Sequence, residues 1–181
     1  MNKIFELPKP KKSEVLSYLV LSDLHDFAMD LKAFDLIIKY FKKTPIKQRR
    51  IILLGDVLDF AFLMDKNPSF KRAKKELDFD DYFVPEMQKT LAWWYDFFET
   101  IKKLVKDPKH IHFMMGNHED RCNRSKFRAF LPHAYSPWFD LYKQLKVKEL
   151  GFNYYDYNTW LKIESKLMPN LLLTHGIYCG S

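Results

Sequence analysis

The fold is decided by a stretch that joins an apolar run to a polar tip, Tyr18-Leu19-Val20-Leu21-Ser22-Asp23-Leu24-His25. Three more apolar runs end in the same way, and their tips read Gly55-Asp56-Val57-Leu58-Asp59, Gly116-Asn117-His118-Glu119-Asp120 and Thr174-His175-Gly176. A buried parallel strand is a continuous apolar run, and open α/β sheets place their chemistry just beyond the carboxyl ends of such strands. We therefore expect the four tips to converge on one site.

Strand and helix patterns alternate along the rest of the chain. The periodicity predicts strands over 16–22, 50–55 and 110–115, helices over 30–43 and 85–106, a broken helical region over 119–147 and further strands within 152–174. We expect 8–13 to be a solvated lead-in and 60–84 to be an insertion at the rim of the domain. This order predicts an α/β fold with a largely parallel sheet, and the late strands predict a second sheet packed on the first.

Length and composition favour a single domain over residues 1–181, because 181 residues that are 47% hydrophobic can bury a sizeable core. The net charge of +7 is compatible with a polyanionic partner such as nucleic acid, and equally with helix faces rich in lysine. Two cysteines cannot form a disulfide framework, which favours a reducing, cytoplasmic setting. We expect no signal peptide and no membrane association, because no apolar run approaches membrane-spanning length.

The polar tips carry the ligands that a pair of metal ions needs. A two-metal site requires a carboxylate that bridges both ions and further nitrogen and oxygen ligands that hold each ion. Asp23 and His25 lie two residues apart, so their side chains can point to the same side of an extended tip. Asp56 follows a glycine that lets the backbone turn sharply, and this position suits the bridging carboxylate.

The third and fourth tips supply the remaining groups. Asn117 can offer its amide oxygen to a second ion, and His175 can offer its imidazole. His118 follows Asn117 directly and should point in a different direction, which suits a group that contacts the substrate. Ligands rich in oxygen with a few imidazoles suit manganese, iron or zinc, and we favour manganese.

Taken together, the four tips resemble the calcineurin-like metallophosphoesterase superfamily over residues 16–181, and Glu119-Asp120-Arg121-Cys122-Asn123-Arg124 is similar to members found in phages and prophages. The resemblance implies a four-layer αββα fold, in which a double β-sandwich is flanked by helices and a dinuclear metal centre lies at the strand ends. It implies metal-dependent hydrolysis of a phosphate ester, with a hydroxide held between the two ions attacking phosphorus in line with the leaving oxygen.

The resemblance also implies a role for each residue of the motifs. Asp23 and His25 would hold the first metal, Asp56 would bridge, and Asn117 and His175 would hold the second metal. His118 would protonate the leaving group or stabilise its developing charge, and Asp59 is the candidate partner of His118. The superfamily pattern closes with a Gly-His-x-His segment that does not occur before Ser181. We therefore expect a C-terminally incomplete domain that lacks the last strands of its second sheet.

The motifs are compatible with several classes of phosphate-ester substrate. Phe60 follows Asp59 where the phosphoprotein phosphatases carry Arg-Gly, which argues against a serine/threonine protein phosphatase. Arg121 and Arg124 follow the third tip, and they form either a phosphate clamp or a solvated helix face. We favour a phosphodiesterase of nuclease-like type. The alternatives are a phosphomonoesterase acting on a nucleotide, sugar phosphate or phosphoprotein, and a non-catalytic scaffold whose metal site has lapsed. The sequence leaves the oligomeric state open.

Aromatic residues are concentrated in the helix expected over 85–106. They could form a base-stacking platform, but their helical spacing beside apolar residues favours the protein core. The aromatic residues concerned are Trp93, Trp94, Tyr95, Phe97 and Phe98.

Overall fold

The computed structural model describes residues 3–10, 15–64, 80–124, 133–164 and 171–175. Its strands are β1 (Lys3–Glu6), β2 (Ser17–Leu21), β3 (Arg49–Leu54), β4 (Ile111–Met114), β5 (Asn153–Tyr155), β6 (Thr159–Ile163) and β7 (Leu171–Leu173). Its α-helices are α1 (Leu31–Phe41), α3 (Phe83–Lys102), α5 (Leu141–Gln144) and α6 (Val147–Leu150). Short 3-10 helices are η1 (Asp26–Ala28), η2 (Ile46–Gln48), η3 (Ala61–Leu63), η4 (Pro108–His110), η5 (Glu119–Cys122) and η6 (His133–Phe139).

The larger sheet has the order β2-β3-β4-β5, and all of its strand pairs are parallel. Leu21 of β2 is paired with Leu53 of β3, and Leu54 of β3 is paired with Met114 of β4. The carboxyl ends of these strands therefore lie at one edge of the sheet, as predicted. The three early strands were predicted within one residue at most of their ends, and β5 joins this sheet rather than the second one.

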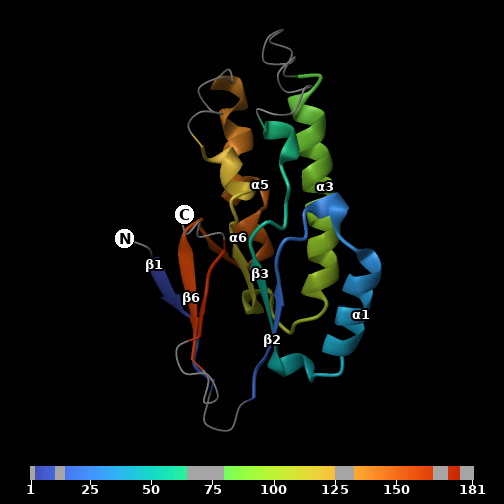
Figure 1. The fold of residues 1–181 in the computed structure, drawn as a ribbon, viewed down its shortest axis with the longest axis vertical. Coiled ribbons are helices and arrows are strands. Elements are labelled where there is room, and N and C mark those ends of the chain that lie inside the picture. The colour runs from blue at the N-terminus through green and yellow to red at the C-terminus, as the bar shows by residue number, and fades with distance from the viewer. Residues whose placement is uncertain (1–2, 11–14, 65–79, 125–132, 165–170, 176–181) are drawn as a thin grey trace, which may run out of the picture.

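The smaller sheet has the order β1-β6-β7, in which β1 is parallel to β6 and β6 is antiparallel to β7. It packs beside the larger sheet, with the helices α1 and α3 on the opposite side of the larger sheet (Figure 1). The second sheet was predicted, but β1 was not, because four residues with only two apolar ones, Ile4 and Phe5, are too short a run to give a strand pattern. Of the predicted lead-in over 8–13, residues 11–13 lie outside the described residues, and Pro8 and Lys9 are exposed, as expected for a solvated segment.

Two helices cover the larger sheet. Asp30 caps α1 by accepting hydrogen bonds from the N–H groups of Lys32 and Ala33, at 2.9 and 3.1 Å. The helix α3 begins at Phe83, two residues before the predicted start, and its buried face packs on the sheet. Trp94 is fully buried there and donates its indole N–H to the carbonyl of Leu145 at 3.3 Å. This contact confirms the core interpretation for that tryptophan.

The region between β4 and β5 is broken, as predicted, into short helical segments with Pro137 inside η6. The predicted insertion over 60–84 is described only at its ends, where η3 follows Phe60, and its central part lies outside the described residues. None of the helices in the described ranges is long and apolar enough to cross a membrane. The mixed α/β architecture with two packed sheets and flanking helices confirms the predicted fold class.

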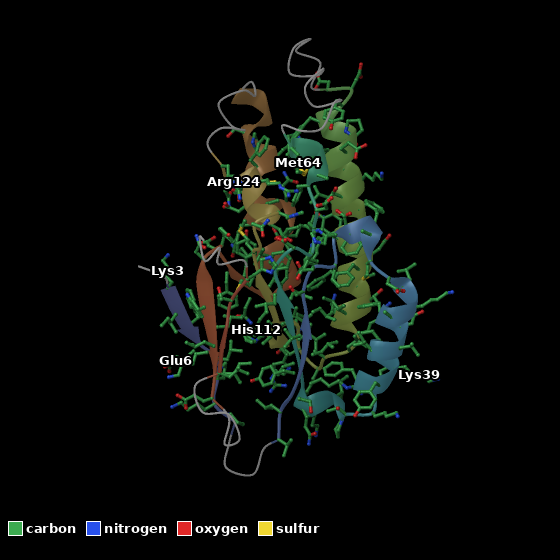
Figure 2. The ribbon with its side chains drawn as sticks, viewed as in Figure 1. Lys3, Glu6, Lys39, Met64, His112 and Arg124 are labelled. Atoms are coloured by element: carbon green, nitrogen blue, oxygen red, sulfur yellow. The ribbon has the colours of Figure 1, made fainter. Side chains whose placement is uncertain are left out.

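His112 is a buried polar residue in the space between the two sheets (Figure 2). It lies on β4, and its Nδ1 is 2.9 Å from the hydroxyl of Tyr155 on the neighbouring strand. The rings of the two residues stack at 18° between their planes. Burial, with a smaller contribution from the charges of His110 and Arg50, lowers the pKa of His112 to about 4. His112 is therefore neutral in the folded protein at neutral pH.

We expect the stability of the fold to fall as the pH is lowered from about 6.5 to about 4. In that window the unfolded chain binds a proton at His112 that the folded chain does not bind, so acid favours unfolding. The shift corresponds to a loss on the order of 3 kcal/mol. Urea unfolding at pH 7 and at pH 4.5 measures this loss. In His112→Gln, which keeps a polar partner for Tyr155 but does not titrate, the loss should be smaller. An equal loss in both proteins would contradict the assignment.

Candidate metal centre

The first two tips are joined by backbone hydrogen bonds that continue beyond the ends of β2 and β3. The N–H groups of Asp23, His25 and Asp26 donate to the carbonyls of Gly55, Asp56 and Val57, at 3.1, 2.9 and 2.8 Å. Several residues here adopt a left-handed backbone that side chains disfavour, namely Asp23, His25, Asp26, Asp56 and Phe60, with φ between 38° and 54°. Each such residue costs about 1–3 kcal/mol, and strain of this kind is concentrated at functional sites.

Two glycines allow the tips to approach one another. Gly55 has φ +77°, and a Cβ atom on it would overlap the ring of His175. Gly116 does not have a positive φ, but a Cβ atom on it would overlap both the backbone nitrogen and the carboxylate of Asp56. Gly55 therefore brings the second tip against the fourth, and Gly116 brings the third tip against the second.

Glu119 links the second and third tips through hydrogen bonds to their backbone. Its carboxylate is fully buried and accepts hydrogen bonds from the N–H groups of Asp56, Leu58 and Gly116, at 3.1, 2.8 and 2.8 Å. Burial raises the pKa of Glu119 to about 7. Asp26 has a similar role, because its carboxylate accepts the N–H of Asp59 at 3.1 Å. Neither carboxylate was predicted to have a role, because nothing in the sequence indicates that these two side chains turn back to accept hydrogen bonds from the backbone of the tips.

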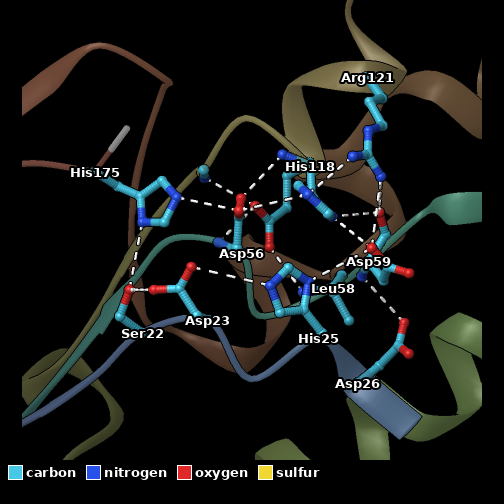
Figure 3. A network of polar contacts seen from close by, with 12 residues as sticks. Ser22, Asp23, His25, Asp26, Asp56, Leu58, Asp59, His118, Arg121 and His175 are labelled. Carbon is cyan, nitrogen blue, oxygen red and sulfur yellow. Dashed lines mark hydrogen bonds and ion pairs between the residues drawn. The ribbon is translucent and has the colours of Figure 1, made fainter. Parts of the chain in front are cut away.

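Asp56 is at the centre of the site (Figure 3). Its Oδ2 atom lies 3.2 Å from Nε2 of His175 and 3.7 Å from Nε2 of His118, while Oδ1 accepts the N–H of His118 at 2.9 Å. Burial tends to raise the pKa of Asp56, but the contacts with the two histidines outweigh it and hold the pKa below its ordinary value. Asp56 is therefore a buried carboxylate anion with an imidazole on either side.

Two groups of potential metal ligands occur among the described residues, and Asp56 belongs to both. One group consists of Asp23, Asp56 and His175, and the other of His25, Asp56 and His118; within each, the ligand atoms lie within 4.8 Å of one another. Asp23 and His25 were predicted to hold the same ion. Their side chains lie 3.9 Å apart, but Asp23 belongs to one group and His25 to the other. Asn117 lies at the carboxyl end of β4, half-buried between Gly116 and His118.

The ring of His175 is oriented as a metal-binding histidine requires. Its Nδ1 lies 2.7 Å from the carbonyl oxygen of Leu54. Because a carbonyl oxygen only accepts, Nδ1 carries a proton, and Nε2 is the ring nitrogen that faces Asp56. A hydrogen bond to a backbone carbonyl commonly fixes the tautomer of a ligating histidine. The donor set around Asp56 therefore fits a divalent cation.

His118 lies between Asp59 and Arg121. Its Nδ1 is 2.5 Å from Oδ1 of Asp59, and its Nε2 is 2.8 Å from Nη2 of Arg121. A guanidinium only donates, so Nε2 is the acceptor and Nδ1 carries the proton that Asp59 accepts. The hydrogen bond with His118 is the main cause that lowers the pKa of Asp59. Asp59 also lies 3.4 Å from Nδ1 of His25, so one carboxylate contacts two imidazoles.

The two arginines singled out in the sequence occupy different environments. Arg121 is buried and also donates from Nη1 to the carbonyl of Asp59 at 2.6 Å, which places it inside the site. Arg124 is exposed and its Nε lies 3.4 Å from Asp120, on the solvent side. They were expected to share a helix face, but η5 ends at Cys122, and the basic residues beyond Arg124 lie outside the described residues.

A carboxylate shared by two groups of metal ligands, at the carboxyl edge of a parallel sheet, is typical of a hydrolase with two metal ions. The chain belongs to the calcineurin-like phosphoesterase family, whose model matches residues 16–179. This match confirms the family that the four tips predicted, and membership of this family supports metal-dependent hydrolysis of phosphate esters. No curated protein and no solved structure gives a significant match to the chain.

Proposed function

We propose that this protein hydrolyses phosphodiesters in a dinuclear metal centre. The observation that carries the proposal is the position of Asp56, which is buried and common to both groups of ligands. A carboxylate in this position can bridge two cations, and two bridged cations stabilise the attacking and leaving oxygens of an in-line displacement. The net charge of +7 supports an extended anionic ester, such as a nucleic acid, as the substrate.

In this proposal Asp23 and His25 hold one ion, Asn117 and His175 hold the other, and Asp56 holds both. The ions would supply a hydroxide at neutral pH and polarise the phosphoryl oxygens. Oxygen and imidazole donors suit manganese, iron and zinc, and we favour manganese. The hydrogen bond that orients His175 and the convergence of Asp23, His25 and His175 on Asp56 support these residues as ligands. Their division between the two ions follows the family resemblance, because the structure groups Asp23 with His175 and His25 with His118.

His118 is proposed to deliver a proton to the leaving oxygen. Nδ1 is tied to Asp59, so the transferred proton must be carried by Nε2. Nε2 accepts from Arg121 in this structure, so it would become protonated only after a phosphoryl oxygen of the substrate has taken over the guanidinium. Asp59 orients the ring and stabilises the positive charge that His118 carries before the transfer. A general acid positioned in this way contributes about 10²–10⁴-fold to the rate.

Arg121 is proposed to bind a phosphoryl oxygen of the substrate, because its guanidinium is already directed at His118 from inside the site. We expect Arg121→Ala to lower kcat/KM for a diester by roughly 10- to 100-fold, the value of a charge-assisted hydrogen bond. Arg124→Ala is the matched control and should lower it by less than about 3-fold, since exposed ion pairs contribute little. Equal effects of the two substitutions would remove Arg121 from the binding site.

A comparison of two chromogenic substrates tests the proposed function. We expect the protein with manganese to hydrolyse bis-p-nitrophenyl phosphate, a diester, with a higher kcat/KM than p-nitrophenyl phosphate, a monoester. A chelator should abolish both reactions, and manganese should restore them. A preference for the monoester would favour the phosphomonoesterase alternative. Folded protein with no turnover of either ester would favour the non-catalytic alternative.

A further inference from the structure

An exposed aromatic ring lies next to the candidate metal centre. Phe27 is 56% exposed and follows His25 by two residues, so their Cα atoms are at most about 7 Å apart. Its short helix, η1, is fixed to the site by the hydrogen bond from Asp26 to the carbonyl of Val57. The N–H of Phe27 also donates to Oδ1 of Asp26 at 2.6 Å. The ring is therefore held at a defined place beside the proposed metal ligands.

Two residues of α3 complete this patch. Trp93 is half-buried, stacks on Phe97 at 4.9 Å between ring centres, and meets the ring of Phe27 at 6.4 Å and 59°. The ammonium group of Lys89 lies over one face of the Phe27 ring, 4.8 Å from its centre. Lys89 and Trp93 are four residues apart and share one face of the helix. The patch thus combines exposed aromatic surface with a positive charge.

The prediction that the aromatic residues of α3 belong to the core therefore holds for some of them and not for others. Trp94 is fully buried, whereas Trp93, together with Phe27, stays partly open to solvent next to the site. Exposed aromatic rings beside positive charge are the surfaces on which nucleic-acid bases stack, and the phosphates of the same strand are attracted by the charge. A simple phosphate ester without a ring would gain nothing from such a patch.

We propose that Phe27, Lys89 and Trp93 form a base-binding subsite, so that the substrate is a nucleotide-containing phosphodiester. The base adjoining the reacting phosphate stacks on the face of Phe27 opposite Lys89, and Lys89 contacts a neighbouring phosphate. This inference rests on the proposed function, because a base can reach the patch in the way described only when its phosphate is bound at the metal centre.

The test is titration calorimetry with adenosine 5′-monophosphate, ribose 5-phosphate and inorganic phosphate in the presence of manganese. The first two ligands differ only by the base. We expect the wild-type protein to bind the nucleotide more tightly by about 5- to 100-fold, the range for base–aromatic stacking. Phe27→Ala should remove this preference while leaving the affinities for ribose 5-phosphate and inorganic phosphate unchanged. Phe27→Leu, which keeps the apolar bulk, should also remove it if ring stacking is the cause.

The control is Tyr40→Ala. Tyr40 is an exposed aromatic residue with Lys43 over its ring at 5.2 Å, but it lies in the last turn of α1, whereas η1 and Phe27 precede the first turn of that helix. Figure 1 shows how α1 runs. This variant should keep the full preference for the nucleotide. A preference that survives in Phe27→Ala, or equal wild-type affinities for the nucleotide and ribose 5-phosphate, would overturn the subsite alone. Failure of inorganic phosphate to bind the wild-type protein would overturn the proposed function and the subsite with it.

Discussion

Asp56→Asn is expected to lower kcat/KM by more than about 10³-fold, beyond the 10²–10³-fold that one electrostatic contact contributes. An asparagine can keep its oxygen at the position of Oδ1, where it accepts the N–H of His118. Its amide nitrogen then takes the position of Oδ2, which faces His175 and His118. An amide nitrogen does not bind a cation, so both ligand groups lose the oxygen they share.

Asp120→Asn is the matched control for this substitution. Asp120 lies on η5 close to the site, but its carboxylate contacts the exposed Arg124 and belongs to neither ligand group. Its loss should change kcat/KM by less than about 2-fold, as expected for an exposed ion pair. The measurement is diester hydrolysis at saturating manganese, with urea unfolding to show that both variants are folded. Activity of Asp56→Asn within 10-fold of wild type would contradict a bridging role, since roughly 10-fold corresponds to only 1.4 kcal/mol.

Gly116→Ala is expected to lower kcat/KM by about 10²-fold, the effect of moving a catalytic group by 1 Å. The added Cβ atom would overlap the backbone nitrogen and carboxylate of Asp56, and a buried backbone segment cannot give way as a flexible side chain can. Overpacking of this kind also destabilises a fold by about 1–3 kcal/mol. Because Gly116 does not have a positive φ, the effect would be steric and not the result of backbone strain.

Gly151→Ala separates these two causes. Gly151 has φ +75°, but the nearest atom to an added Cβ would be Cβ of Pro108 at 3.9 Å, which is an ordinary contact. This variant should lose about 1 kcal/mol of stability through backbone strain and keep full activity. Kinetics and urea unfolding on both variants measure the two effects. If Gly116→Ala retained full activity, the close approach of the third tip to Asp56 would be irrelevant to catalysis.

The strands were predictable where burial leaves a continuous apolar run. Ile51, Ile52 and Leu53 are fully buried because β3 is covered on one face by helices and on the other by the second sheet. The strand β1 has no such signal, because it is an edge strand whose pairing with β6 depends on residues more than 150 positions away. The assignment of β5 to the larger sheet was missed for a similar reason, since a three-residue strand carries little pattern.

The positions of the polar tips could be predicted from the strands, but the hydrogen bonds between the tips could not. Asp59 was expected beside His118, and the structure places its carboxylate against Nδ1 of that ring. The role of Glu119 depends on three N–H groups that only the folded backbone brings together. The burial of Arg121 depends on a 3-10 turn that directs it back toward Asp59, and a broken helical region predicted over 119–147 does not specify such a turn.

Anomalous diffraction from manganese-soaked crystals tests the dinuclear centre most directly. We expect two manganese ions about 3.5–4 Å apart, with the carboxylate of Asp56 bound to both. One ion should have Asp23 and His25 as further ligands, and the other should have Asn117 and His175. A single ion at Asp56, or two ions that share no carboxylate, would contradict a dinuclear centre bridged by Asp56.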